Sequence, residues 1–297
     1  MILISFLLVS CFACLLSGGL ETYATPENFT IIALPDTQFY SSTYPAIFNN
    51  QTSWIVNNVE ALNIVFVTHE GDLVNTYSST TEWQRANTSM SKLDNSVLWA
   101  VLPGNHDGVS SGQTTVNYNT YFGYNRFNGK SWYGGAYQNI NTNNYELFTA
   151  AGDQFIIFHL QYAPSDSVLN WANNIISSYP NRRAIVTTHD YLLATGARSS
   201  VGQNIWTKFI KPHANQIFIV LCGHARGEAQ RTDTVNGHKV YQVLADYQSR
   251  PNGGNGWLRI LEFQPAISKI LVETYSPYLN QYEKDSNSQF TLSYDMS

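Results

Sequence analysis

Short apolar runs that each end in a polar turn are the feature that most constrains the fold of this 297-residue chain. Each run has the length and the β-branched content of a buried strand. A chain that repeats this pattern must place several strands side by side, with their polar ends available for chemistry. The five runs cover residues 31–35, 64–68, 97–102, 184–188 and 217–222.

Helical patterns separate several of these runs. Apolar residues recur at helical spacing over 45–60, 81–93 and 165–178, and Ser or Thr provides a candidate cap for the helices. Alternation of strand and helix predicts an α/β core whose strands are packed between helices. Residues 25–297 contain no internal repeat and no Pro-rich linker, so we expect them to form one domain.

The pattern changes in two parts of the chain. After Gly223 the apolar runs are shorter, at 237–244, 257–263 and 269–274, and we expect them to form a second, more antiparallel sheet. Residues 108–150 are rich in Asn, Gly and Tyr, which predicts a long loop insertion.

The first residues predict export. The apolar run 2–16 is too short to span a membrane comfortably, and small residues follow it as far as Ala24. We therefore expect residues 1–24 to be a secretory signal peptide and the protein to be extracellular. Two alternatives stay open, a lipoprotein anchored through Cys11 and an uncleaved N-terminal anchor; no later stretch could span a membrane.

Cleavage there would remove two of the three cysteines, Cys11 and Cys14. Cys222 would then have no partner for an internal disulfide. It ends an apolar run, where a free Cys packs as a small hydrophobic side chain.

Composition excludes two other classes of protein. Hydrophobic residues make up 43% and aromatic residues 14% of the chain, which is far from the composition of a disordered protein. The 16 basic and 21 acidic residues give a net charge of −5 without any cluster of Lys or Arg, so we expect no nucleic-acid-binding patch.

Polar residues at the ends of the five runs carry the functional signal. Asp36, Asp72, Asn105, His189 and His224 each follow a predicted strand. In α/β sheets, residues beyond the carboxyl ends of strands converge even when they are distant in sequence. Carboxylate, amide and imidazole groups are the ligands that Zn²⁺, Mn²⁺ or Fe²⁺ takes. The pattern therefore predicts a site for a divalent metal ion.

The motifs around these residues are, in order, Asp36-Thr-Gln38, Gly71-Asp72, Gly104-Asn-His-Asp107, His189 and Gly223-His224. Over residues 30–230 their order and identity resemble the calcineurin-like metallophosphoesterase superfamily. The resemblance implies a four-layer α/β sandwich, in which two mixed β-sheets flanked by helices hold two metal ions between them. It also implies that the chain hydrolyses phosphoric esters with a metal-activated water.

The resemblance further implies a role for each matching residue. Asp72 would bridge the two metal ions, Asn105, His189 and His224 would complete one metal site, and Asp36 would belong to the other. In the same motif set, His106 would protonate the leaving oxygen or hold the phosphate, with Asp107 orienting it.

Two positions depart from the family pattern. Gln38 and Arg226 stand where the family usually has histidines, and both would serve the same metal ion. Gln offers only a neutral carbonyl oxygen, and Arg cannot ligate. We therefore expect one tightly held metal ion per chain, with Arg226 either paired to Asp36 or contacting the substrate phosphate. Residues 246–248 and 254–259 resemble later motifs of a subset with a Pro-Asp-Thr-Gln opening, but imply no role.

Alternative interpretations remain for the function and for two histidines. A degenerate member of the same fold would bind a metal ion or ligand without turnover. Gly108-Val-Ser-Ser-Gly112 matches the serine-hydrolase pattern, although no strand directly precedes it. For His69 we favour a hydrogen bond to the backbone over a metal-related role, and for His159 a satisfied place in the core.

Overall fold

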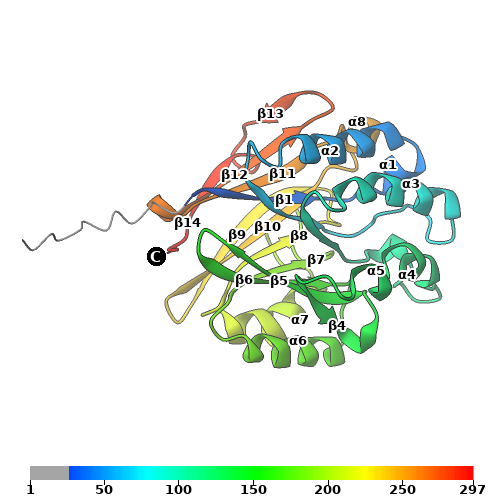
Figure 1. Cartoon of the computed structure of the whole chain (residues 1–297). Helices are drawn as coiled ribbons and strands as arrows, with labels where there is room; N and C mark the ends of the chain where they lie inside the picture. Colours follow the sequence, from blue (N-terminus) through cyan, green and yellow to red (C-terminus); the bar gives the residue numbers. More distant parts are fainter. Residues whose placement is uncertain (1–26, 297) are drawn as a thin grey trace, which may run out of the picture.

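Two β-sheets packed face to face form the centre of the protein, with helices on both outer faces (Figure 1). The computed structural model describes residues 27–296, so the predicted signal peptide lies outside the described residues. Within that part of the chain, none of the helices has the length and apolar character needed to cross a membrane.

The first sheet has seven strands in the order β13-β12-β11-β1-β2-β3, with β14 also paired to β12. β1, β2 and β3 are parallel, whereas β11, β12, β13 and β14 are each antiparallel to their neighbours. Its strands are β1 (Phe29–Leu34), β2 (Ile64–His69), β3 (Leu98–Val101), β11 (Leu258–Gln264), β12 (Lys269–Ser276), β13 (Gln281–Glu283) and β14 (Phe290–Ser293).

The second sheet also has seven strands, in the order β4-β5-β6-β7-β8-β10-β9. β6, β7, β8 and β10 are parallel, and antiparallel strands complete both edges. Its strands are β4 (Tyr133–Ala136), β5 (Asn143–Ala150), β6 (Asp153–Leu160), β7 (Arg183–Thr188), β8 (Ile217–Cys222), β9 (Gly227–Val235) and β10 (His238–Asp246).

Both faces of each sheet are buried, which explains why the central strands are apolar throughout. In β1, Ile32 and Leu34 pack against the helices, whereas Ile31 and Ala33 face the other sheet. Helices α2 (Pro45–Asn57) and α3 (Thr80–Met90) cover the first sheet, and α6 (Asp166–Ser178) and α7 (Ser200–Ile205) cover the second (Figure 1). The four layers confirm the predicted sandwich.

Side-chain caps fix where two of the predicted helices begin. Ser79 accepts a hydrogen bond from the backbone N–H of Glu82, and Ser165 accepts one from that of Val168. The predicted helix over 81–93 ends earlier as an α-helix, and residues Ser91–Leu93 continue it as a 3₁₀ turn.

The expected separate antiparallel sheet after Gly223 is wrong. β10 joins the second sheet by parallel pairing with β8, while β11 and β12 extend the first sheet from β1. Strand periodicity does not specify a strand's partner; here an open edge on each sheet accepts one part of the C-terminal segment.

The expected loop over residues 108–150 is also wrong. The segment contains α4 (Val116–Phe122), α5 (Tyr124–Phe127), β4 and the whole of β5. Tyr118, Phe122 and Phe127 are buried against Trp83 and Trp99, so the aromatic residues of this segment build core. Burial of these rings compensates for a local sequence with little helical propensity.

Candidate metal centre

The strand ends converge as the sequence predicts. Asp36 follows β1, Asp72 follows β2 and Asn105 follows β3, while His189 and His224 follow β7 and β8 of the other sheet. Because these strands are parallel within each sheet, their carboxyl ends lie at one edge, and the two sheets contribute to a single site.

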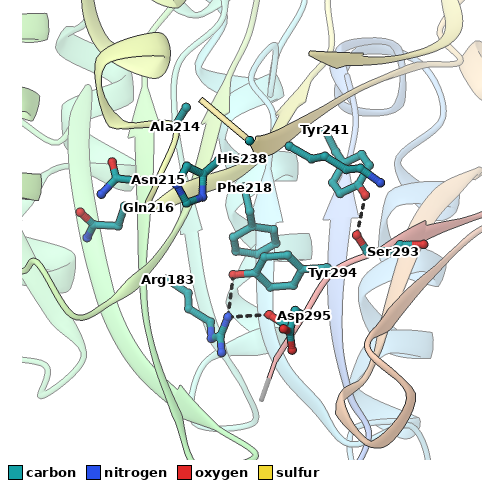
Figure 2. A pocket seen from close by; sticks show the side chains of 12 residues that line it. Arg183, Ala214, Asn215, Gln216, Phe218, His238, Tyr241, Ser293, Tyr294 and Asp295 are labelled. Atoms are coloured by element: carbon teal, nitrogen blue, oxygen red, sulfur yellow. Dashed lines mark hydrogen bonds between the residues drawn. The ribbon is translucent and has the colours of Figure 1, made fainter. Parts of the chain in front are cut away.

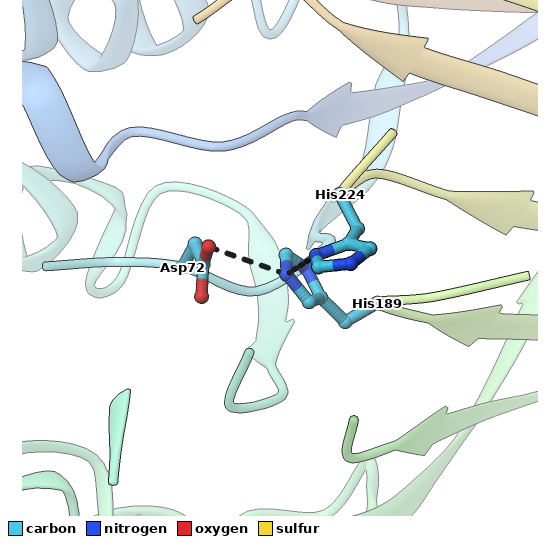
Figure 3. Close-up of side chains that lie close together, drawn as sticks. All are labelled: Asp72, His189 and His224. Atoms are coloured by element: carbon cyan, nitrogen blue, oxygen red, sulfur yellow. Dashed lines mark hydrogen bonds and ion pairs between the residues drawn. The ribbon is translucent and has the colours of Figure 1, made fainter. Parts of the chain in front are cut away.

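Asp72, His189 and His224 form the centre of this site (Figure 3). Each of these residues offers a ligand atom, and these atoms lie within 4.8 Å of one another. His189 Nε2 lies 3.3 Å from Asp72 Oδ2 and 3.2 Å from His224 Nδ1. The Asn105 side-chain oxygen is 3.1 Å from the same nitrogen. One carboxylate, one amide oxygen and two imidazoles thus meet at one point, a donor set that fits a divalent metal ion.

Close approach of the backbone holds the two carboxylates in place. The N–H of His106 donates to Asp72 Oδ1 at 2.8 Å, and the N–H of His224 donates to Asp36 Oδ2 at 3.1 Å. A Cβ atom at Gly104 would lie 2.2 Å from Asp72 Oδ1, and one at Gly223 would lie 2.3 Å from Asp36 Oδ2. Glycine is therefore required at both positions for steric reasons.

The charges of the site favour a bound cation. Burial lowers the pKa of His189, but the Asp72 and Asp36 carboxylates outweigh it and raise that pKa to about 10. Burial raises the pKa of Asp72, yet the contact with His189 holds it below its usual range. Burial and the Asp246 carboxylate raise the pKa of Asp36 well above its usual range. The shifts of His189 and Asp72 indicate that these two groups favour each other's charged forms, whereas burial beside Asp246 favours the neutral form of Asp36.

Asp107 does not orient His106, contrary to the prediction. Its buried side chain accepts three backbone N–H groups, from Leu73 at 3.1 Å, Val74 at 3.0 Å and Gly104 at 2.8 Å. Burial and the Asp72 carboxylate raise the pKa of Asp107 to about 8, although the three N–H groups lower it. Asp107 thus ties the loop after Asp72 to the loop after β3.

His106 is instead oriented by Asn75. His106 Nδ1 lies 2.8 Å from the Asn75 carbonyl oxygen, so this nitrogen carries a proton and donates it to that oxygen. Nε2 is then left as the nitrogen that can meet a substrate. The half-buried ring stays beside the metal centre, as its predicted role requires.

Arg226 does not pair with Asp36, so that prediction is wrong. The chain turns at His224, which has a φ of 67°, and enters β9 at Gly227. Arg226 is exposed and forms no ion pair with any described residue. Its predicted contact with a substrate phosphate stays a prediction.

Gln248 and Asp246 occupy the surroundings of Asp36 instead. The Gln248 side-chain amide donates to Asp246 Oδ2 at 2.8 Å and to Asp36 Oδ1 at 3.4 Å, and the Gln38 amide donates to Gln248. The sequence marks residues 246–248 as a motif but assigns them no role, because their place depends on how β10 pairs.

Two other histidines have structural roles, as expected. His69 Nε2 bonds the Thr37 hydroxyl at 2.9 Å, and its Nδ1 accepts the N–H of Gly71 at 3.2 Å. Burial and the neighbouring His189 lower the pKa of His69 to about 3. His159 is buried between Glu146, at 2.7 Å, and the Thr68 hydroxyl, at 2.9 Å.

The serine-hydrolase pattern does not form an active site. The segment before Ser110 is a 3₁₀ turn, Asn105–Asp107, rather than a strand. The Ser110 hydroxyl donates to the Asn105 carbonyl oxygen at 3.0 Å. An activated serine would need a strand-to-helix elbow and a histidine base.

Tyr162 is a site residue that sequence analysis missed. Its half-buried ring lies 5.4 Å from that of His224 and 6.0 Å from that of His189, measured between centroids. It follows β6, so its place beside the histidines depends on the pairing of β6 with β7.

A surface pocket is present at the opposite edge of the second sheet (Figure 2). Arg183 and Phe218 line it from the first residues of β7 and β8, and Tyr294 lines it from the C-terminal segment. The candidate ligands follow the other ends of the same strands. This pocket is therefore separate from the metal centre.

Comparison with known proteins agrees with this geometry. The family model described as calcineurin-like phosphoesterase matches residues 29–225. The uncharacterized protein YvnB of Bacillus subtilis (strain 168) is 38% identical over 284 residues, which are 91% of this chain and 22% of that protein. The chain thus spans about a fifth of the length of this curated relative.

Two solved structures share the fold. Purple acid phosphatase PPD1 from yellow lupin (Lupinus luteus) seeds has a TM-score of 0.61 at 14% identity, over 92% of this chain and 55% of that one. A dimetal phosphatase from Danio rerio has a TM-score of 0.58 at 10% identity, over 90% of this chain and 99% of that one. With the family model matching most of the sequence, the chain belongs to the calcineurin-like phosphoesterase family.

Proposed function

We propose that this chain hydrolyses phosphoric esters with the help of a divalent metal ion. The observation that carries the proposal is the meeting of Asp72, Asn105, His189 and His224 at one point, with His106 directly beside it. When bound there, a divalent ion activates water and neutralises charge on a phosphate. The names of the lupin and zebrafish proteins, both phosphatases, support the same reaction class.

Hydrogen bonds to backbone carbonyl oxygens orient the histidines that we assign to the reaction. His189 Nδ1 donates to the Glu70 carbonyl oxygen at 2.9 Å, which turns its Nε2 toward Asp72. His106 is held through Nδ1, and in its doubly protonated form it can donate the Nε2 proton to a phosphate oxygen or to the leaving oxygen. Exposed Arg226 follows His224 in sequence, and we assign it a contact with the substrate phosphate.

Paired substrates test the proposal and narrow the ester class. The purified chain is stripped with a chelator, reloaded separately with Zn²⁺, Mn²⁺ or Fe²⁺, and assayed with nitrophenyl phosphate and bis-nitrophenyl phosphate. We expect metal-dependent release of nitrophenol from one or both. Bound metal without release from either ester would favour the alternative, a non-catalytic binding member of the fold.

We further propose that the protein is exported, with residues 1–24 as the cleaved signal peptide. The apolar run 2–16 and the low share of charged residues, 12%, support this. N-terminal sequencing of protein recovered from the culture medium should find a start near residue 25. A start at Met1, or a lipid on Cys11, would contradict it.

A further inference from the structure

The surroundings of Asp36 do not fit a second metal ion. The family usually has histidines at the positions of Gln38 and Arg226, and here Arg226 is exposed. Asp36 and the shared Asp72 are the expected ligands that remain. Two carboxylates are fewer than the three protein ligands of a catalytic zinc site.

The side chain of Gln248 fills the space beside Asp36. Its Nε2 donates to Asp246 Oδ2 at 2.8 Å and to Asp36 Oδ1 at 3.4 Å. Asp36, Asp246 and Gln248 are only 3%, 1% and 6% exposed. The two hydrogens of the amide nitrogen are therefore both used, and this nitrogen lies between two buried carboxylates, where a cation would otherwise bind.

All four carboxylate oxygens of Asp36 and Asp246 accept a hydrogen bond. Gln248 supplies three of these bonds, since its backbone N–H also donates to Asp246 Oδ1 at 2.9 Å. The N–H of His224 donates to the fourth oxygen, Asp36 Oδ2, at 3.1 Å. A metal ion could bind here only by displacing donors that these buried oxygens already have.

Gln38 holds the Gln248 amide in this orientation. The side-chain nitrogen of Gln38 donates to the side-chain oxygen of Gln248. Turning the Gln248 amide so that its oxygen faced the aspartates would bring the two NH₂ groups together. The contact between the glutamines thus selects the nitrogen as the group that faces Asp36 and Asp246.

Positive charge reaches these aspartates from the neighbouring metal centre. Asp36 Oδ1 lies 3.9 Å from His189 Nε2. A protonated His189, or the ion that it binds, therefore compensates for the buried carboxylate charge. A second ion is not required for this purpose.

Parallel pairing explains how Gln248 reaches this position. Leu244 in β10 is the register partner of Cys222 in β8. The chain leaves β10 after Asp246, at the edge of the sheet where His224 follows β8, and Gln248 lies two residues farther along. The motif at residues 246–248 thus acquires a role beside the metal centre.

We propose that the Gln248 side chain takes the place of a second metal ion and limits the centre to one ion. The proposal rests on the proposed function, whose metal centre includes His189 and His224. It gives the expected single ion a different cause, because Gln248, and not Arg226, bonds Asp36. Removal of this one amide should therefore open a second metal site.

Metal stoichiometry of Gln248→Ala tests the proposal. The wild type and the variant are stripped with a chelator and dialysed against excess Mn²⁺, and bound Mn²⁺ is measured by elemental analysis. We expect one ion per chain for the wild type and two for the variant. In the variant, Asp36, Asp246 and Gln38 Oε1, a buried oxygen without a hydrogen-bond partner, become available as ligands. Electron paramagnetic resonance identifies neighbouring ions, since Mn²⁺ ions about 3.5–4 Å apart couple magnetically.

Gln242→Ala is the matched control. Gln242 is a buried glutamine of β10, and its Nε2 likewise donates to an aspartate, Asp233, at 2.8 Å. This pair is bonded to Arg198 rather than to a metal ligand. The control should keep one ion, and a second coupled ion in it would overturn the role that we assign to Gln248.

Two neighbouring ions in the wild type, or one ion in a folded Gln248→Ala variant, would overturn the proposal. A wild type that binds one ion and hydrolyses neither nitrophenyl ester would support it and reject the proposed function. Hydrolysis by a wild type with two neighbouring ions would do the reverse, so the two failures are distinguishable.

Gln248→Glu covers the case in which Gln248→Ala does not fold, which circular dichroism would show. Glutamate has the shape of glutamine but offers an oxygen in place of the NH₂ group, so a third carboxylate would meet Asp36 and Asp246. Because the charge of the ligands sets affinity, titration calorimetry should show a second Mn²⁺ bound at least about tenfold more tightly than any second ion in the wild type. A single binding event in both proteins would overturn the proposal.

Discussion

The carbonyl oxygen of Glu70 lies 2.9 Å from His189 Nδ1, and this contact determines which nitrogen of the ring faces Asp72. Glu70 follows β2 in one sheet and His189 follows β7 in the other. A hydrogen bond across the two sheets thus orients a metal ligand before any ion binds.

The first prediction concerns the histidines of the centre. His189→Ala and His224→Ala should each abolish tight binding of a metal ion at the centre that these histidines form with Asp72, because each variant removes one of its two imidazoles. His238→Ala is the control, since His238 is exposed at the start of β10. Elemental analysis after loading with one equivalent of Zn²⁺ measures the effect. Full Zn²⁺ retention in both variants would contradict the assignment.

The second prediction concerns Asp107. Asp107→Asn replaces an oxygen that accepts backbone N–H groups with an amide nitrogen, which leaves at least one buried donor unpaired. Above pH 8, where Asp107 is ionised, the free energy of unfolding should fall by about 2–3 kcal/mol. Urea denaturation measures this change, and Asp166→Asn, at an exposed carboxylate, is the control. An Asp107→Asn variant as stable as the wild type would mean that the three N–H groups find other acceptors.

The candidate metal ligands of this chain are more predictable from the sequence than the residues that surround them. Asp36, Asp72, Asn105, His189 and His224 could be found because each follows an apolar run, and parallel strands bring such positions to one edge. Their convergence therefore required only the strand pattern and the order of the motifs.

What the sequence did not predict depends on tertiary pairing or on local backbone direction. Asp246 reaches the centre only because β10 pairs with β8 in a particular register. Arg226 is exposed, and it follows a turn at which His224 adopts a positive φ, a conformation that the sequence does not predict for a histidine. Asp107 accepts backbone N–H groups from loops whose contact is likewise a product of the fold.

The third prediction is a pH dependence away from the metal centre. Hydrogen bonds from Arg231 and Gln242 and the charge of Arg198 outweigh burial and lower the pKa of Asp233 to about 2. A folded-state pKa below the unfolded value of about 3.9 means that the ionised group stabilises the protein above that value. The contribution is lost as the pH falls from about 4 to 2.

Asp233→Asn tests this dependence. The variant should be less stable than the wild type at pH 7, and the difference should shrink as the pH falls through that window. Urea denaturation at several pH values measures both proteins, and Asp153→Asn provides a control ion pair at another place. A difference that stays constant down to pH 2 would show that charge is not the cause.

Turnover by His106→Ala is the most direct test of the central claim, that this centre hydrolyses phosphoric esters. The variant and the wild type are loaded with the same metal, their metal contents are measured, and nitrophenol release is compared. We predict equal metal content and a loss of turnover of about 10²–10⁴-fold, because His106 acts on the substrate and does not ligate the ion. Equal metal content with a loss of less than about threefold would contradict this account of the site.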